Sequence, residues 1–177
     1  MNKYIFLDVD GVLNSTRSTY ALGPAARKIS EEGYRRVFSH DAEIISAYEH
    51  QVTNYIDPIA VALINRLTDI TRAKIVVSST HRKHVSNLYK MQTYMEAFGL
   101  TGHVIDRTPV INGKRGVEIE YWLNKYGGEF YDYVIIDDDS DMLEHQSCNF
   151  VHTDAEFGFT HKDYLRCLEI FRDKDVI

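Results

Sequence analysis

The sequence contains little cysteine. Cys148 and Cys167 are the only two cysteines among 177 residues. They do not have the close, paired spacing of a metal site. We therefore expect two reduced thiols in a cytoplasmic protein rather than a disulfide.

Long apolar runs are also missing. No stretch approaches the roughly 20 apolar residues that span a bilayer, so we expect no membrane partner. The start, Met1–Lys3, leads directly into a predicted strand, which is not the pattern of a signal peptide. No internal repeat or low-complexity linker divides the chain, and its apolar content of 44% suits one buried core. We predict a single domain over residues 1–177.

Positive charge is scarce overall, because 20 Lys and Arg stand against 26 Asp and Glu, for a net charge of −6. That balance argues against a protein that coats nucleic acid. The exception is segment 72–115, where eight Lys and Arg against two acids give +6 and leave −12 for the remainder. A basic segment in an acidic protein suits an anionic substrate, and uneven charge on solvated faces explains it equally well.

Polar side chains, by contrast, gather at the ends of predicted buried strands. The apolar run 4–7 predicts a short strand, and Asp8, Asp10 and Gly11 follow it. Carboxylates two residues apart on an extended chain can point the same way and offer hard oxygen ligands. Gly11 allows the backbone to turn sharply. The alternative is an ordinary capped turn, since Asp and Gly are common turn residues.

Two further predicted strands end in polar side chains. The strand predicted at 74–77 leads into Ser78 and Ser79, which either cap the next helix or cradle a phosphate with backbone N–H groups. The strand predicted at 133–136 leads into an acidic pair. This pair is Asp137 and Asp138. In a parallel sheet all three strand ends lie at one edge, where α/β folds place their active sites.

Helical patterns alternate with these strands. A helix over 57–70 is predicted from Asp57 as N-cap and Pro58 at its first position. Ile59, Leu63, Ile64 and Leu67 give this helix its apolar spacing. A second helix is predicted over 117–126, with Val117 and Tyr121 facing the core and Ile119 and Trp122 as further candidates for that face. The other predicted elements are a loop at 15–20, helices at 83–98 and 160–172, and strands at 104–105 and 150–151. The alternation predicts an α/β fold, a Rossmann-like parallel sheet with helices on both faces.

Residues 15–55 form a predicted insertion after the first strand, which we interpret as a small helical cap. Pro24 suits a helix start, and helices are expected over 25–38 and 41–50. The cations of the insertion either meet a substrate as a lid or lie on a solvated face among acids. These cations are Arg27, Lys28, Arg35, Arg36 and His40.

Together the motifs resemble those of the haloacid dehalogenase-like (HAD) phosphohydrolases over almost the whole chain. The four HAD motifs are similar to residues 8–12, Ser78 after its apolar strand, a cation at 114–115, and the pair 137–138. More narrowly, the chain resembles the HAD domains of RNA repair proteins and the phosphatase half of polynucleotide kinase-phosphatases. The supporting stretches are 7–14, 77–82, 115–119 with 122–123, 134–142, and 151–154 with 158–160.

The resemblance implies covalent phosphoryl transfer with Mg²⁺ as cofactor. Asp8 would be the nucleophile, and Asp10 would protonate the leaving oxygen and then activate water. Ser78 would hold phosphate oxygens, and either Lys114 or Arg115, of which Arg115 lies nearer the helix, would neutralise charge. The implied metal ligands are Asp8, the backbone carbonyl of Asp10, Asp137 and Asp138. Asp138 or Asp141 could also orient the cationic side chain at 114–115. The implied substrate-binding residues are Ser79, Thr80 and Arg82.

The implied substrate is a phosphomonoester, on a nucleotide or on the 3′ end of a nucleic acid. Alternatives are a phosphatase of small non-nucleotide metabolites, a phosphotransferase, and a non-catalytic binding module on the HAD scaffold. One departure lies at Thr80 and His81, where repair-type domains often carry an aromatic residue. Calcium binding by 137–141 is disfavoured, because this stretch follows a strand and lacks EF-hand spacing. No oligomeric state is predicted.

Overall fold

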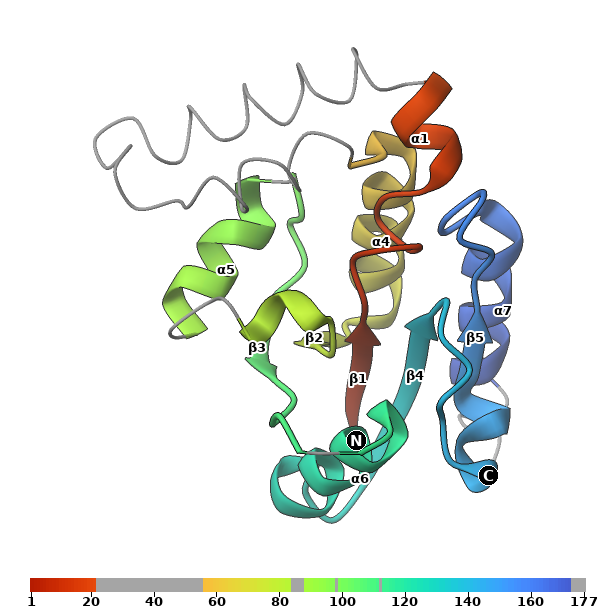
Figure 1. Cartoon of the computed structure of the whole chain (residues 1–177). Coiled ribbons are helices and arrows are strands. Elements are labelled where there is room, and N and C mark those ends of the chain that lie inside the picture. Colours follow the sequence, from red (N-terminus) through yellow and green to blue (C-terminus); the bar gives the residue numbers. More distant parts are fainter. Residues whose placement is uncertain (22–55, 84–87, 98, 112, 173–177) are drawn as a thin grey trace.

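The computed structural model describes residues 1–21, 56–83, 88–97, 99–111 and 113–172. Five parallel strands form one sheet in the order β3-β2-β1-β4-β5 (Figure 1). The strands are β1 (Asn2–Leu7), β2 (Lys74–Val77), β3 (Val104–Arg107), β4 (Tyr131–Asp137) and β5 (Phe150–His152). The α-helices are α1 (Thr16–Ala21), α4 (Pro58–Thr71), α5 (Leu88–Ala97), α6 (Arg115–Tyr126) and α7 (His161–Arg172), and the 3-10 turns are η1 (Thr80–Lys83) and η2 (Glu144–Asn149).

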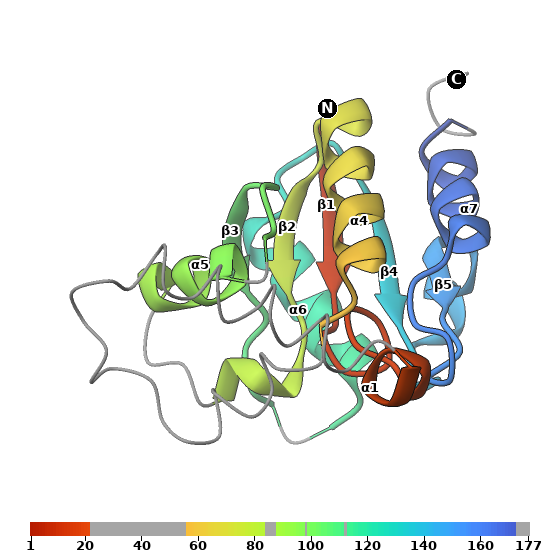
Figure 2. The same ribbon diagram turned by 90° about the horizontal axis from the view of Figure 1, so that it is seen from above.

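The central strand β1 separates two apolar layers. Ile5 and Leu7 pack with residues of α4, α5 and α7, whereas Tyr4 and Phe6 pack with residues of α6. This division follows from the alternation of side chains along a strand. Figure 2 shows α4 and α6 on opposite sides of the strands. The predicted Rossmann-like parallel sheet with helices on both faces is confirmed.

The predicted start of α4 is confirmed. Asp57 Oδ1 accepts a hydrogen bond from the backbone N–H of Ile59 at 2.8 Å, and Pro58 is the first helical residue. Ile64 and Leu67 are fully buried as expected. Ile59 is not part of the buried face, because 57% of it is exposed at the first turn.

The inward face of α6 differs from the prediction. Ile119, Trp122 and Leu123 are buried, with spacings of three and four residues that place them on one side of the helix. Tyr121 lies on another side and is 45% exposed, so its predicted inward orientation is wrong. Trp122 packs edge-on against the aromatic rings of β1 and thereby joins α6 to the sheet.

Other boundaries also differ. The predicted loop 15–20 contains α1, because Ser15 Oγ accepts a hydrogen bond from the N–H of Ser18 and caps the helix. Within the predicted helix 83–98, the described residues contain α5 (Leu88–Ala97), and the preceding η1 ends at Lys83. The helices expected at 25–38 and 41–50, and the five cations of that insertion, lie outside the described residues.

Both cysteines are free, as expected. Within the described ranges, no helix combines the length and the apolar character that crossing a membrane requires. Because β1, β2 and β4 run in parallel, their carboxyl ends meet at one edge of the sheet. The candidate site lies at this edge.

Candidate functional site

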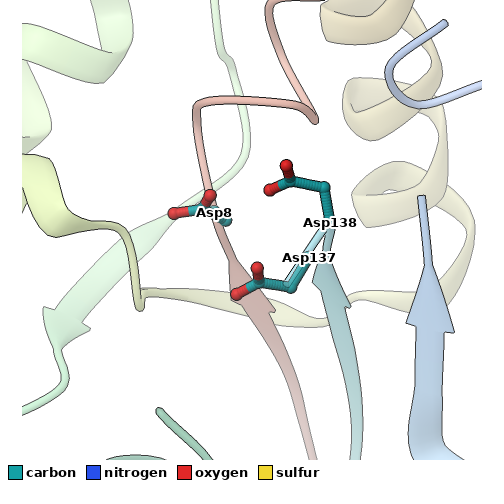
Figure 3. A group of neighbouring side chains, drawn as sticks. All are labelled: Asp8, Asp137 and Asp138. Atoms are coloured by element: carbon teal, nitrogen blue, oxygen red, sulfur yellow. The ribbon is translucent and has the colours of Figure 1, made fainter. Parts of the chain in front are cut away.

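Three carboxylates converge at the ends of β1 and β4. Asp8 follows β1, Asp137 is the last residue of β4, and Asp138 comes next. One oxygen from each lies within 4.8 Å of the others. Figure 3 shows the three side chains gathered at the ends of the two strands. Only Asp8 and Asp137 are buried, and Asp138 is partly exposed. We name these three residues the carboxylate cluster.

The carboxylate cluster concentrates negative charge in a poorly solvated place. Burial is the largest cause that raises the pKa of Asp8, and Arg115 and Ser79 only partly oppose it. Burial and the charge of Asp8 raise the pKa values of both Asp137 and Asp138. Such a group of carboxylates is stabilised by any cation that enters it.

Arg115 supplies a cation from the protein itself. Its Nη1 donates to Asp8 Oδ1 at 2.7 Å and to the backbone carbonyl of Ser78 at 2.8 Å. Its Nε lies 3.1 Å from Asp137 Oδ2. Burial alone would lower the pKa of Arg115, but the two aspartates outweigh burial and raise it. Lys114, the other candidate, is exposed at the N-cap position of α6.

The loop after β4 fixes the start of α6, and with it Arg115. Asp141 Oδ2 accepts a hydrogen bond from the backbone N–H of Arg115 at 2.8 Å. Gln146 donates to the carbonyl of Gly116 and accepts from the N–H of Leu143, both at 2.9 Å. A Cβ at Gly116 would lie 2.5 Å from Gln146 Oε1, so this close contact requires glycine. Asp141 therefore orients the element that carries the cation.

The carboxylate of Asp10 is directed away from the carboxylate cluster. Its Oδ2 lies 2.8 Å from Nε2 of the buried His81, and its Oδ1 accepts a hydrogen bond from Asn14 Nδ2 at 2.8 Å. The hydrogen bond with His81 is the largest cause that lowers the pKa of Asp10. The contact of His81 with Asp10 was not predicted from the sequence. The available signal was the position of His81 shortly after Ser78 and Ser79.

The turn after Asp10 depends on Gly11. Gly11 has φ +68, a conformation that favours glycine, and its N–H donates to Asn14 Oδ1 at 3.0 Å. A Cβ at Gly11 would lie 2.3 Å from Cγ of Asp138. The missing side chain thus leaves room for a carboxylate of the cluster.

The loop after β2 brings hydroxyl groups to the same edge. We name residues 78–80 the serine loop. Ser78 is buried, and its Oγ has no hydrogen-bond partner among the described residues. The Ser79 hydroxyl accepts a hydrogen bond from the N–H of His81 at 3.3 Å, and Thr80 is exposed at the start of η1. The Ser78 hydroxyl is therefore a buried polar group that no described residue satisfies.

Arg82 occupies a different place from the one expected for a substrate ligand. It is buried, its Nη1 donates to the carbonyls of Ser78 and Ser79 at 2.6 Å, and its Nε donates to Thr108 O at 3.1 Å. It also pairs with the buried Glu118, whose Oε1 accepts a hydrogen bond from a backbone N–H. Because these contacts occupy the guanidinium, Arg82 shapes the serine loop from within the protein.

Comparison with known proteins assigns the chain to a family. The profile of the HAD domain in Swiss Army Knife RNA repair proteins matches residues 4–164. The chain belongs to this family. A solved structure from Thermotoga maritima, assigned as a beta-phosphoglucomutase, is 20% identical, with 100% of both chains covered and a TM-score of 0.41. No curated protein matches the HAD domain described here.

Family membership confirms the resemblance found in the motifs. The HAD domain carries Asp8, the serine loop, Arg115 and the pair after β4 at one edge of its sheet. The general activity that family membership indicates is phosphoester chemistry, either hydrolysis or transfer of a phosphoryl group.

Proposed function

We propose that this HAD domain is a Mg²⁺-dependent phosphomonoesterase that works through a phosphorylated Asp8. The observation that carries the proposal is the position of Asp8, buried at the end of β1 and in contact with Arg115. A carboxylate beside a fixed cation suits nucleophilic attack on an anionic phosphate.

The carboxylate cluster suits Mg²⁺. Its oxygens are the hard ligands that this ion prefers. Asp137 Oδ2 is buried without a hydrogen-bond partner among the described residues, because Arg115 Nε approaches it without the alignment of a hydrogen bond. We assign Asp8, Asp137, Asp138 and the backbone carbonyl of Asp10 as ligands. When bound, Mg²⁺ supplies positive charge that reduces the repulsion between carboxylate and phosphate.

The residues divide the reaction into two steps. Asp8 forms a bond to phosphorus while the bond to the leaving oxygen breaks, and Asp10 gives its proton to that oxygen. Asp10 then takes a proton from water, whose oxygen attacks phosphorus and releases inorganic phosphate from Asp8. His81 and Asn14 hold the Asp10 carboxylate for both proton transfers.

The serine loop and Arg115 are proposed to hold the phosphate. Ser78 offers its buried hydroxyl, and the backbone N–H groups of Ser79 and Thr80 lie at the same loop. Arg115 stabilises the negative charge that develops during transfer. Lys114 is exposed at the helix start, and we assign it no catalytic part.

We propose a nucleotide or a polynucleotide 3′-phosphate as the substrate. The support is the family's link to RNA repair and the basic segment 72–115. A phosphatase of small metabolites, a phosphotransferase and a non-catalytic module are the rivals. Turnover of a 3′-phosphorylated oligonucleotide faster than that of mononucleotides supports the polynucleotide substrate, and faster turnover of mononucleotides rejects it in favour of a nucleotide. Faster turnover of sugar phosphates than of either rejects the proposal. We also propose a cytoplasmic single domain over 1–177 with residues 15–55 as its cap.

The nucleophile is tested by Asp8→Asn. We expect at least a 10³-fold loss of Mg²⁺-dependent phosphate release from para-nitrophenyl phosphate, because an amide cannot form the acyl phosphate (about 4 kcal/mol of barrier). The control is Asp69→Asn, which changes an exposed aspartate on α4 and is expected to keep activity. Full activity of purified Asp8→Asn would reject the assignment.

A further inference from the structure

A groove beside the active site combines exposed tyrosines with cations. It encloses about 560 Å³ next to the end of β3 and along α6. We name it the tyrosine groove and define it by six of its lining residues. These are Lys83, Arg107, Val110, Tyr121, Lys125 and Tyr126.

The tyrosine groove adjoins a smaller cavity that reaches Arg115. This cavity of about 300 Å³ shares Lys83 and Val110 with the tyrosine groove and is also lined by Thr80 and Arg115. Arg115 contacts the proposed nucleophile Asp8. The shared residues place the tyrosine groove next to a cavity that ends at Arg115, so a polymer in the groove lies close to the proposed phosphate site.

Helix α6 sets the distance between the phosphate site and the tyrosines. Arg115 is its first residue, and Tyr121 and Tyr126 follow six and eleven residues later. With a rise of 1.5 Å per residue, they lie about 9 and 16 Å farther along the helix axis. At about 3.4 Å per stacked nucleotide, this distance accommodates several nucleotides.

Both tyrosine rings are accessible for stacking. Tyr121 is 45% exposed and Tyr126 is 51% exposed. Trp122 supports the ring of Tyr126, with centroids 5.8 Å apart. Lys125 Nζ lies 5.7 and 5.1 Å from the centroids of Tyr121 and Tyr126, and this exposed side chain can move to a phosphate when a base takes the ring face.

The lining of the tyrosine groove is mainly cationic. Lys83, Arg107 and Lys125 face one acid, Asp106, whose Oδ2 accepts a hydrogen bond from Trp122 Nε1 at 2.7 Å. Cations that follow a phosphate backbone, together with aromatic rings that stack bases, are the usual means of binding single strands.

We propose that the tyrosine groove binds the single-stranded nucleic acid that precedes the 3′-terminal phosphate, with bases on Tyr121 and Tyr126 and phosphates at the cations. This inference rests on the proposed function and names where the polymer lies. An acidic peptide would use the cations and leave two exposed ring faces unused, whereas each nucleotide supplies both a phosphate and a base.

The main experiment measures kcat and KM for para-nitrophenyl phosphate and for 3′-phosphorylated single strands of one, two, four and eight nucleotides. For the unaltered protein we expect KM to fall with length. In the double variant Tyr121→Ala with Tyr126→Ala, we expect kcat/KM for the octamer, relative to the aryl phosphate, to fall about tenfold or more. Phe130→Ala is the matched control, because this 69% exposed ring lies just before β4, at the opposite end of the strand from the cluster.

A salt series tests the cations separately. Two phosphate contacts on a single strand contribute about 1.4 to the slope of log affinity against log salt concentration. We expect Lys83→Gln with Lys125→Gln to reduce the slope for the octamer by about this amount. Lys74→Gln, which changes an exposed lysine at the start of β2, is expected to leave the slope unchanged.

The outcomes separate this inference from the proposed function. If the protein releases phosphate from the octamer and the tyrosine variant keeps the same octamer-to-aryl ratio, the tyrosine groove is not the binding site. If no phosphate is released from any substrate, the proposed function fails. Fluorescence anisotropy of a labelled octamer then tests the groove directly, where equal affinity of the unaltered protein and the tyrosine variant overturns it.

Discussion

Single acidic residues at this sheet edge differ because their surroundings differ. Burial raises the pKa of Asp8 and of Asp138, whereas the hydrogen bond with His81 lowers the pKa of Asp10. The carboxylate cluster is therefore under mutual repulsion, which suits a cation site. The hydrogen bond with His81 favours the ionised form of Asp10, which suits the proposed activation of water and opposes the proposed donation of a proton in the first step.

Asp138→Asn is expected to stabilise the metal-free protein while reducing activity. The pKa of Asp138 is raised in the folded state, so the folded protein binds more protons and loses stability as pH rises through that pKa. An amide removes this loss, and we expect a Tm about 2–4 °C higher at neutral pH. The advantage should vanish as pH falls below about 3.9, the ordinary pKa of Asp, because Asp138 is then protonated in both states. Calorimetry without metal at pH 3 to 8 checks this, and a lower Tm at pH 7 contradicts it.

In the profile of kcat against pH, His81→Phe is expected to move the fall in kcat on the acidic side to higher pH. Removing the largest cause of the lowered pKa lets that of Asp10 rise, so the carboxylate that activates water is protonated earlier as pH falls. His81→Gln keeps a donor and should restore part of the original profile. A fall in kcat that stays at the same pH in both variants shows that His81 has only a packing role.

Among the structural elements, the serine loop and α6 are joined by one buried ion pair. Arg82 holds the carbonyls of Ser78 and Ser79, and Glu118 extends from α6 to meet it. The alignment of the proposed phosphate site thus depends on a contact between two residues that are 36 positions apart in the sequence.

Glu118→Leu alone should destabilise the fold by about 3–5 kcal/mol, because it leaves the buried Arg82 charge without a partner. Arg82→Met combined with Glu118→Leu should recover much of that loss, since no charge then remains buried. Urea unfolding of both variants measures the difference. If the double variant is as unstable as the sum of the single variants, the two residues do not act as a pair.

The strands were accessible to sequence reasoning, whereas several contacts between elements were not. β2 has the predicted bounds, and β1 and β4 extend the predicted runs by two or three residues, because apolar side chains mark buried strands directly. The contacts His81–Asp10 and Arg82–Glu118 join distant segments, and their proximity depends on the strand order. The outward position of Tyr121 was missed because an aromatic residue on a helix was assigned to the core.

At the scale of the whole molecule, we expect Arg115 to allow folding without metal. Its guanidinium already lies between Asp8 and Asp137, so the buried carboxylates are not left unpaired. We expect the chelated protein to unfold cooperatively and Mg²⁺ at 100 times its Kd to add about 2.7 kcal/mol of stability. Thermal unfolding with and without Mg²⁺ checks this. Asp137→Asn should lose the increase, and a chelated protein without a cooperative transition would contradict the expectation.

The turn at Gly11 links two parts of the site mechanically. The Asp138 carboxylate occupies the space that a side chain at position 11 would fill, and the N–H of Gly11 holds Asn14, which in turn holds Asp10. A displacement of Asp138 toward Gly11 would therefore meet the same turn that positions Asp10. In the proposed mechanism, cation binding at Asp138 and the position of the Asp10 carboxylate would be linked through a residue that has no side chain.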